Sequence, residues 1–207
     1  MNKILHTTLV VFALLLLTPK VNAQAWQRDS RVLSLGFGAS DFFHLDGYYY
    51  DGTPINRSWY QPLTGQVNFQ GEFGVHKYVG LGFTTGIGGR GPWAYGYGGE
   101  FNIPIGFLAN FHFYQLIADN VSRNIHADKL DLYFGANIGS GIAFAYYPNT
   151  SRIVPMAFGG LQFGLRYYFS PNVGINGEFG WGKSIVNVGF VFKLHSNHQQ
   201  QTQTQTQ

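Results

Sequence analysis

Apolar and polar residues alternate one by one along eight stretches of this chain. In residues 173–181, Phe179 falls on the opposite face of an extended chain from Glu178, and in residues 186–194, Phe192 falls on the opposite face from Lys193. Side chains along a β-strand point alternately to opposite faces, so a period of two predicts strands. The predicted strands cover residues 31–41, 63–75, 78–88, 99–111, 130–143, 156–169, 173–181 and 186–194.

Two β architectures fit eight alternating strands. A soluble sandwich or lipocalin-like barrel turns its apolar faces inward, whereas a transmembrane barrel turns them toward lipid and keeps a polar interior. The polar faces here carry mainly glycine, asparagine and glutamine, which suit a narrow interior, and the apolar faces are rich in phenylalanine. Charged residues make up 11% of the chain, against about 25% in soluble domains. We therefore predict an all-β fold, an eight-stranded antiparallel transmembrane up-and-down β-barrel.

Residues 1–23 have the pattern of a secretory signal peptide. Lys3 supplies the positive start, Leu9–Leu17 form an apolar core, and cleavage is expected after Ala23 or after Ala25. The apolar core is too short to span a bilayer as a helix of the mature protein. The mature chain is therefore predicted to be exported.

The rest of the chain divides into a barrel over residues 24–194 and a polar tail over residues 195–207. The tail is a glutamine- and threonine-rich repeat with too little apolar surface to order, so we expect it to be disordered. Loss of Lys3 and Lys20 with the signal peptide lowers the formal charge of +3 by two, to +1, which gives no indication of a nucleic-acid partner. The chain has no cysteine, which excludes a disulfide framework.

The connections between the predicted strands alternate in length. If the first strand starts on the periplasmic side, the long connections 42–62, 89–98 and 144–155 face outward, as is usual in transmembrane barrels. The outer connection at Gly182-Lys183 is very short. The first loop is rich in tyrosine and aspartate, which suits recognition of sugars or proteins but also suits interfacial aromatics on a mobile loop.

The inner connection 112–129 is long for a turn on the periplasmic side. Leu116, Ile117, Val121 and Ile125 have an approximately helical spacing along it. This spacing predicts a short amphipathic helix at the inner rim, with an irregular turn as the alternative.

The end of the predicted barrel carries a recognisable motif. The stretch "LRYYFSPNVGINGEFGWGKSIVNVGFVFKL", residues 165–194, combines an aromatic strand, a Ser-Pro-Asn turn and Gly-x-x-Gly-Glu-x-Gly. It resembles the last hairpins of the small eight-stranded outer-membrane β-barrels of Gram-negative bacteria, a group similar to the transmembrane domain of outer membrane protein A. The resemblance implies an outer-membrane location and an assembly signal that the barrel-assembly machinery reads. The residues matching that signal are Asn187, Gly189, Phe192 and Leu194, after which the chain continues for thirteen residues where many members stop.

Five charged residues fall on the inward faces of the predicted strands. They are Glu72, Glu100, Arg166, Glu178 and Lys193. Isolated charges are costly in a narrow lumen, so they are expected to pair. Their pairing fits a structural network that plugs the barrel, and it also fits a gated conduction path. The interior of an eight-stranded barrel is just wide enough for side chains, which favours the plug.

Three short motifs could indicate chemistry, and each lacks the context it requires. "HSNHQ", residues 195–199, is similar to patterns of lipid A deacylases, but it follows the last strand on the periplasmic side. His195 and His198 provide two metal ligands without a third. "GIGGRG", residues 86–91, matches a dinucleotide-binding pattern, but Pro92 follows it instead of a helix. We therefore predict no catalysis, no metal and no cofactor.

These observations predict a monomeric outer-membrane barrel with a structural or surface-interaction role. Its expected partners are outer-membrane lipid, the barrel-assembly machinery and a surface ligand bound by loops 42–62, 89–98 and 144–155. The alternatives are a small channel or carrier for apolar molecules, resembling the outer membrane protein W group, and a lipid A modifying hydrolase. A continuous polar lumen would favour the channel, and a Ser–His–acid cluster at the outer rim would favour the hydrolase.

Overall fold

The computed structural model describes residues 25–40, 43–44, 48–50, 53–55, 64–90, 99–121, 125–147 and 150–194. The predicted signal peptide, the predicted tail and much of the first two outer loops lie outside these ranges. The described elements are β1 (Arg31–Ser40), β2 (Phe43–His44), β3 (Tyr48–Tyr50), β4 (Thr53–Ile55), β5 (Thr64–His76), β6 (Val79–Arg90), β7 (Gly99–Phe111), α2 (Phe113–Asn120), β8 (Leu130–Tyr147), β9 (Thr150–Tyr168), β10 (Val173–Gly180) and β11 (Val186–Leu194).

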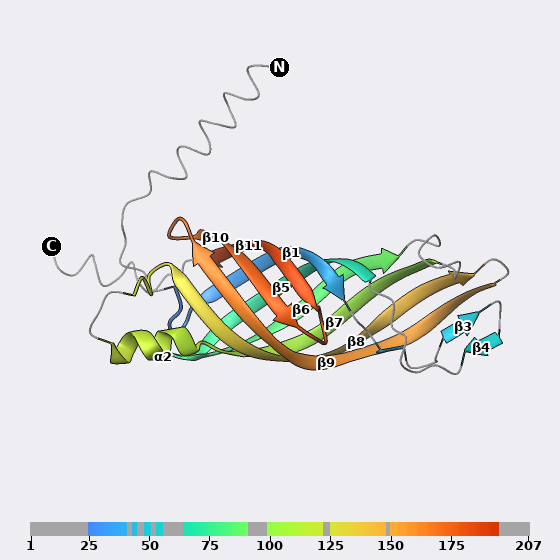
Figure 1. The fold of residues 1–207 in the computed structure, drawn as a ribbon, viewed down its shortest axis with the longest axis horizontal. Coiled ribbons are helices and arrows are strands. Elements are labelled where there is room, and N and C mark those ends of the chain that lie inside the picture. The colour runs from blue at the N-terminus through green and yellow to red at the C-terminus, as the bar shows by residue number, and fades with distance from the viewer. Residues whose placement is uncertain are drawn as a thin grey trace, which may run out of the picture.

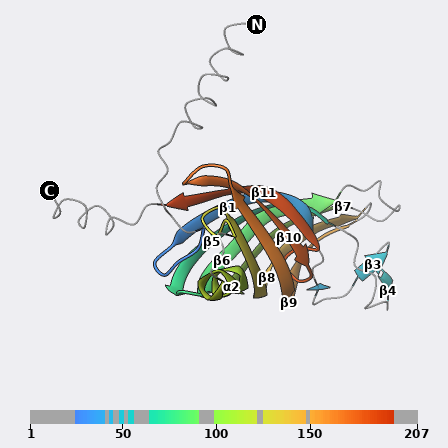
Figure 2. The ribbon, with the colours of Figure 1, turned by 60° about the vertical axis from the view of Figure 1, so that its left-hand side comes forward.

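Eight antiparallel strands close into a ring in the order β1, β5, β6, β7, β8, β9, β10 and β11 (Figure 1). Figure 2 shows the closure from another side, where β11 lies beside β1 and β10 lies beside β9. A closed ring gives each wall strand two neighbours, which is how a sheet satisfies its backbone groups in lipid. The predicted eight-stranded barrel is therefore confirmed.

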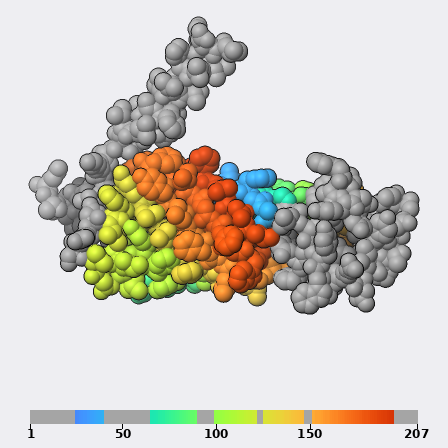
Figure 3. Space-filling model, viewed as in Figure 1, coloured from blue at the N-terminus to red at the C-terminus, as the bar shows by residue number. Residues whose placement is uncertain are grey.

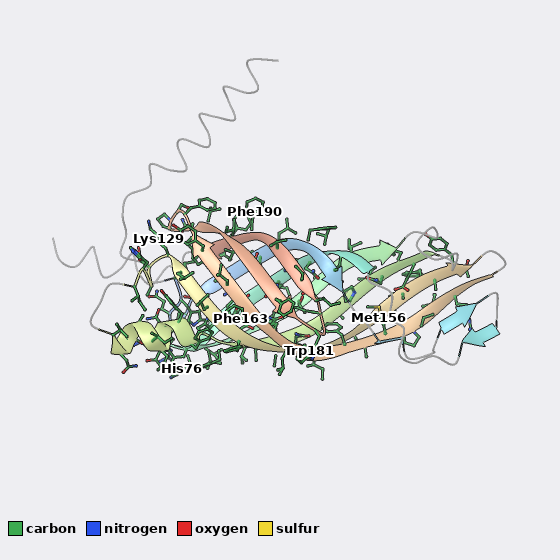
Figure 4. The ribbon with its side chains drawn as sticks, in the orientation of Figure 1. His76, Lys129, Met156, Phe163, Trp181 and Phe190 are labelled. Atoms are coloured by element: carbon green, nitrogen blue, oxygen red, sulfur yellow. The ribbon has the colours of Figure 1, made fainter. Side chains whose placement is uncertain are left out.

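The two surfaces of the wall have opposite polarity, and both are inverted relative to a soluble protein. Outward side chains such as Phe107, Ile138 and Phe179 are 73%, 68% and 66% exposed. Figure 3 shows one side of this outer surface, over β8 to β11, and Figure 4 labels Phe163, Trp181 and Phe190 among the side chains of the wall. The buried side chains that face inward are mostly amides and charges. Only a lipid environment makes this arrangement favourable.

The two ends of the barrel differ in their connections. We call the end with the β5–β6 turn and α2 the inner end, and the end with the β8–β9 turn the outer end. The predicted helix of the inner connection is confirmed as α2, although Val121 and Ile125 lie beyond its last residue. In the described part of the chain, no helix is long and apolar enough to cross a membrane.

One predicted loop is largely strand. Residues 144–155 were expected to form an outer loop, but β8 continues to Tyr147 and β9 begins at Thr150. Pro155 makes this part of the sequence look like a break, because proline removes a donor from the ladder. It is accommodated because β9 pairs with β10 only from Gln162 onward, so this part of β9 is an edge. Near the outer end, the only described pairing on this edge is with β2.

Candidate functional site

The first part of the site is a cluster of charges at the inner end of the lumen. Arg166 of β9 forms ion pairs with Glu72 of β5 and Asp131 of β8; its Nη1 lies 3.5 Å from Asp131 Oδ2. His112, just after β7, lies between the same two carboxylates. Its Nε2 is 2.8 Å from Glu72 Oε1, and its Nδ1 is 2.9 Å from Asp131 Oδ1. We call these four residues the inner cluster.

The inner cluster is neutral when His112 is protonated. A carboxylate oxygen can only accept a hydrogen bond, so with both acids ionised both ring nitrogens of His112 must donate. Two cations, His112 and Arg166, then face two anions, Glu72 and Asp131, and all four side chains are at most 2% exposed. Paired charges are the form in which buried ions are tolerated.

Aromatic rings enclose the inner cluster. Trp26 stacks on His112 with ring centroids 3.5 Å apart and an interplanar angle of 7°. The Arg166 guanidinium lies 4.4 Å from the centroid of the Tyr133 ring, within cation–π range. Two glycines make room for these groups: a Cβ at Gly80 would collide with Glu72, and one at Gly164 would collide with the Tyr133 ring.

Trp26 reaches the lumen because the segment before β1 is tied to the inner rim. Ala25 N–H donates to Ala127 O at 2.7 Å, and Asp29 N–H donates to Gly74 O at 2.8 Å. Gly74 N–H in turn donates to Ser30 O at 2.8 Å. Ala25 and Trp26 are both 1% exposed, so this short segment covers the inner cluster from the inner end.

The second part of the site surrounds Glu178 of β10. Lys183 Nζ lies 2.6 Å from Glu178 Oε2, which also accepts from Gln70 at 2.8 Å and from Asn187 at 3.0 Å. The Tyr133 hydroxyl donates to Glu178 Oε1 at 2.7 Å. Because the Tyr133 ring also contacts Arg166, it joins this group to the inner cluster. The two parts together are called the lumen network below.

The five charges chosen from the sequence do not all meet. Glu72 and Arg166 pair directly, and Glu178 joins them through Tyr133. Glu100 lies at the outer end, opposite Ala145, and accepts from Asn102 at 3.3 Å. Lys193 lies at the inner end with its ammonium 5.0 Å from the centroid of the Tyr168 ring.

Sequence reasoning missed several members of the lumen network. His112 could have been found, because it continues the inward series of Leu108 and Asn110 by two more residues. Asp131 shares the polar face of its strand with Tyr133, so alternation could have placed it in the lumen as well. Lys183 carries no such signal, because it sits in the turn between β10 and β11 and folds back into the lumen.

The residues of the predicted assembly signal occupy both faces of β11. Asn187 points inward, where it also accepts from Asn68 at 3.2 Å. Gly189 lies against the backbone of Leu35, and Phe192 and Leu194 are exposed on the outer surface. Their recognition by the assembly machinery stays a prediction.

The other sequence motifs do not contribute to the site. The described part of "GIGGRG" is the end of β6, and the histidines of the tail lie outside the described residues. Within the described ranges, no group of three or more His, Asp or Glu side chains is arranged to hold a metal ion.

Comparison with known proteins identifies the fold. No protein-family model and no curated protein matches the sequence. The structure is similar to the outer membrane protein OprG from Pseudomonas aeruginosa, with a TM-score of 0.54 at 11% identity, over 84% of this chain and 100% of that chain. It is also similar to the N-terminal β-barrel domain of OprF from Pseudomonas aeruginosa, with a TM-score of 0.49 at 11% identity, over 81% of this chain and 98% of that chain.

A third similar structure is Ail, the attachment invasion locus protein of Yersinia pestis, with a TM-score of 0.45 at 17% identity, over 81% of this chain and 96% of that chain. OprG and Ail are outer-membrane proteins. At these identities the likeness concerns the fold, and the match to OprG carries it. The chain therefore has the fold of the small eight-stranded transmembrane β-barrels of the bacterial outer membrane.

Proposed function

We propose that this protein is a non-conducting outer-membrane barrel that acts through its outer surface, by structural support or by surface contact. The observation that carries the proposal is the lumen network. It joins side chains of β5, β8, β9, β10 and the β10–β11 turn across the interior. Glu72, His112, Asp131, Arg166 and Glu178 each contact two or more partners, and Lys183 contacts Glu178, which supports a role of the network as a plug.

An ion crossing the lumen would have to displace these pairs. Breaking a buried pair leaves an uncompensated charge, and this costs a free energy of about 3–5 kcal/mol. Glu72, for example, is held by both Arg166 and His112, and Trp26 lies over His112 from the inner side. The free-energy barrier from several such contacts in series supports a closed lumen.

A closed lumen leaves the outer connections as the functional surface. The first of them contains a short hairpin, in which Tyr48–Tyr50 of β3 pairs with Thr53–Ile55 of β4. The β8–β9 hairpin carries the wall several residues beyond the end of β10 on the same end. These features support a role in surface contact. The proposal includes no catalysis, since His112 contacts carboxylates and aromatic rings instead of a hydroxyl that it could activate.

Single-channel recording in planar bilayers tests the proposal. The wild-type protein is expected to give no stable conductance, whereas Arg166→Gln and Glu178→Gln are expected to leak because each removes one partner of a buried pair. Glu100→Gln is the matched control, because it makes the same change as Glu178→Gln at the outer end, away from the lumen network. Steady conductance in the wild type that shifts with either network variant would overturn the proposal.

A specific observation favours a second candidate, a carrier for apolar molecules. At the outer end five inward side chains of β8 and β9 are apolar and buried; they are Ala143, Ala145, Val154, Met156 and Phe158. Such a lining could hold an apolar ligand above the lumen network. Titration with the apolar fluorophore 1-N-phenylnaphthylamine tests it: saturable binding that Met156→Asp weakens about tenfold would support the carrier, and equal partitioning into both proteins would exclude it.

A further inference from the structure

The helix α2 has the polarity of the barrel wall and not that of a helix on a soluble protein. Leu116 and Ile117 are 38% and 45% exposed, whereas Gln115 is 3% exposed. Successive residues of an α-helix turn by about 100°, so Phe113, Leu116 and Ile117 share one face and Gln115 and Asp119 share the opposite one. The outward face is thus apolar except at its C-terminal end, where the exposed Asn120 donates to Leu116 O at 2.8 Å.

The apolar face of α2 continues the lipid-facing surface of the wall. Phe113 stacks on Phe134 of β8 with ring centroids 5.0 Å apart, and its centroid is 6.1 Å from that of Phe163 on β9. Phe134 and Phe163 point outward from the barrel and are 57% and 37% exposed. The helix therefore lies against the outside of the wall at its inner end, beside β8 (Figure 1).

The polar face of α2 is fastened to the β5–β6 turn. Asp119 accepts from the Tyr78 hydroxyl at 2.8 Å and pairs with Lys77 Nζ at 2.8 Å. Gln115 donates to the other oxygen of Asp119 at 3.1 Å. Burial opposes ionisation of Asp119, but the hydrogen bonds from Lys77 and Tyr78 outweigh it and lower the pKa of this carboxyl. The same contact raises the pKa of Lys77.

We propose that α2 is an interfacial helix whose apolar face, formed by Phe113, Leu116 and Ile117, lies among the phospholipids of the leaflet at the inner end of the barrel. Such helices bury their apolar face about 5–10 Å into the boundary between headgroups and acyl chains. Continuity with the lipid-facing aromatic rings places the apolar face at the depth of lipid. The contact of Asp119 with Lys77 holds the polar face toward the rim.

This interface would set how deeply the inner end sits in the bilayer. The contact of α2 with lipid does not involve the lumen network, so the proposal applies whether or not the lumen conducts. A helix that packed a second copy of the chain would present the same apolar face, and the experiment below separates these two occupants.

Because the chain has no cysteine, a single introduced cysteine can be spin-labelled without first removing any native thiol. A nitroxide is attached to Leu116→Cys or to Ile117→Cys, and the full chain is refolded into vesicles of phosphatidylethanolamine and phosphatidylglycerol. Phe107→Cys, in the middle of the outward apolar surface, is the lipid control, and Asp128→Cys, in the exposed turn before β8, is the water control. Accessibility to oxygen and to a water-soluble nickel chelate is measured for each label.

The proposal expects the labels at 116 and 117 to favour oxygen over the nickel chelate, as the label at 107 does. Accessibility equal to that of the label at 128 would overturn it. Spin–spin broadening at 116 or 117 that disappears on dilution into excess lipid would assign the face to a second copy and also overturn it. Heat-modifiable migration on a gel checks that each variant is folded. Labels are placed at both 116 and 117 so that the result does not depend on one variant that fails to fold.

Discussion

The inner and outer ends of the lumen are lined by the same two strands but by opposite chemistry. At the inner end, β8 and β9 turn Asp131, Tyr133 and Arg166 inward, and at the outer end they turn Ala143 and Met156 inward. The outward positions do not change in this way. Phe134 near one end and Ile153 near the other are both exposed and apolar.

This difference shows that the outward and inward faces of one strand meet different physical requirements. The outward face must match lipid along the whole wall, so it stays apolar from end to end. The inward face answers only to what fills the barrel, and it changes from ion pairs to apolar packing. Removing a charge should therefore cost most in the inner cluster, where ion pairs join several strands, and changes in packing should cost stability wherever a side chain fills the lumen.

The largest expected effect is the loss of Arg166. Arg166→Gln leaves Glu72 and Asp131 with one cation fewer, and removing one partner of a buried ion pair lowers the free energy of unfolding by about 3–5 kcal/mol. Urea unfolding from lipid vesicles measures this change. Arg152→Gln, the same substitution at the exposed outer end of β9, is the control and is expected to change it by less than about 1 kcal/mol. Equal effects of the two variants would remove the contrast between the ends.

A smaller effect is expected from crowding the network without changing any charge. Gly164→Ala puts a methyl group into the Tyr133 ring, and overpacking of this kind costs about 1–3 kcal/mol. Gly159→Ala is the matched control in the same strand, because its Cβ would come no closer than 3.7 Å to the Asn137 carbonyl oxygen. The same unfolding assay should find the control near wild type. Similar losses in both variants would show that Tyr133 is free to move aside and does not need its present position.

The smallest effect is a pH dependence confined to the inner end. Asp119 has a pKa below its usual value of 3.8 in the folded protein, so its contact with Lys77 adds stability above that value and loses it as the pH falls through the lower, folded pKa. Lys77 behaves in the opposite sense, because its raised pKa means that the contact is lost only as the pH rises above 10.5.

The mobility of a nitroxide at Leu116→Cys is therefore expected to rise below pH 3.8, whereas a label at Phe144→Cys near the outer end should not respond. Asp119→Asn is the control, because it removes the titrating group while keeping the side chain's shape. A mobility change that survives in this variant would mean that another group releases the helix.

Positions in the site could be predicted where they depend on one strand, and could not be predicted where they depend on contacts between segments far apart in the sequence. The outward apolar positions and the inward places of Glu72, Arg166 and Glu178 could be predicted, because each follows from alternation within one strand. The partner of Glu178 could not, since Lys183 enters the lumen from a turn, where alternation says nothing about direction. The role of Trp26 was equally hidden, because it precedes the first strand and reaches His112 only through backbone bonds to the rim.

The sequence by itself determined that this chain forms a barrel with an apolar outside and a polar inside. Every strand must turn apolar side chains toward lipid, so the alternation of apolar and polar residues is visible within each strand and occurs eight times. Only the tertiary structure decided which charges meet. Glu72, His112 and Arg166 are brought together by the register between strands and the closure of the ring, and these are set by all eight strands at once.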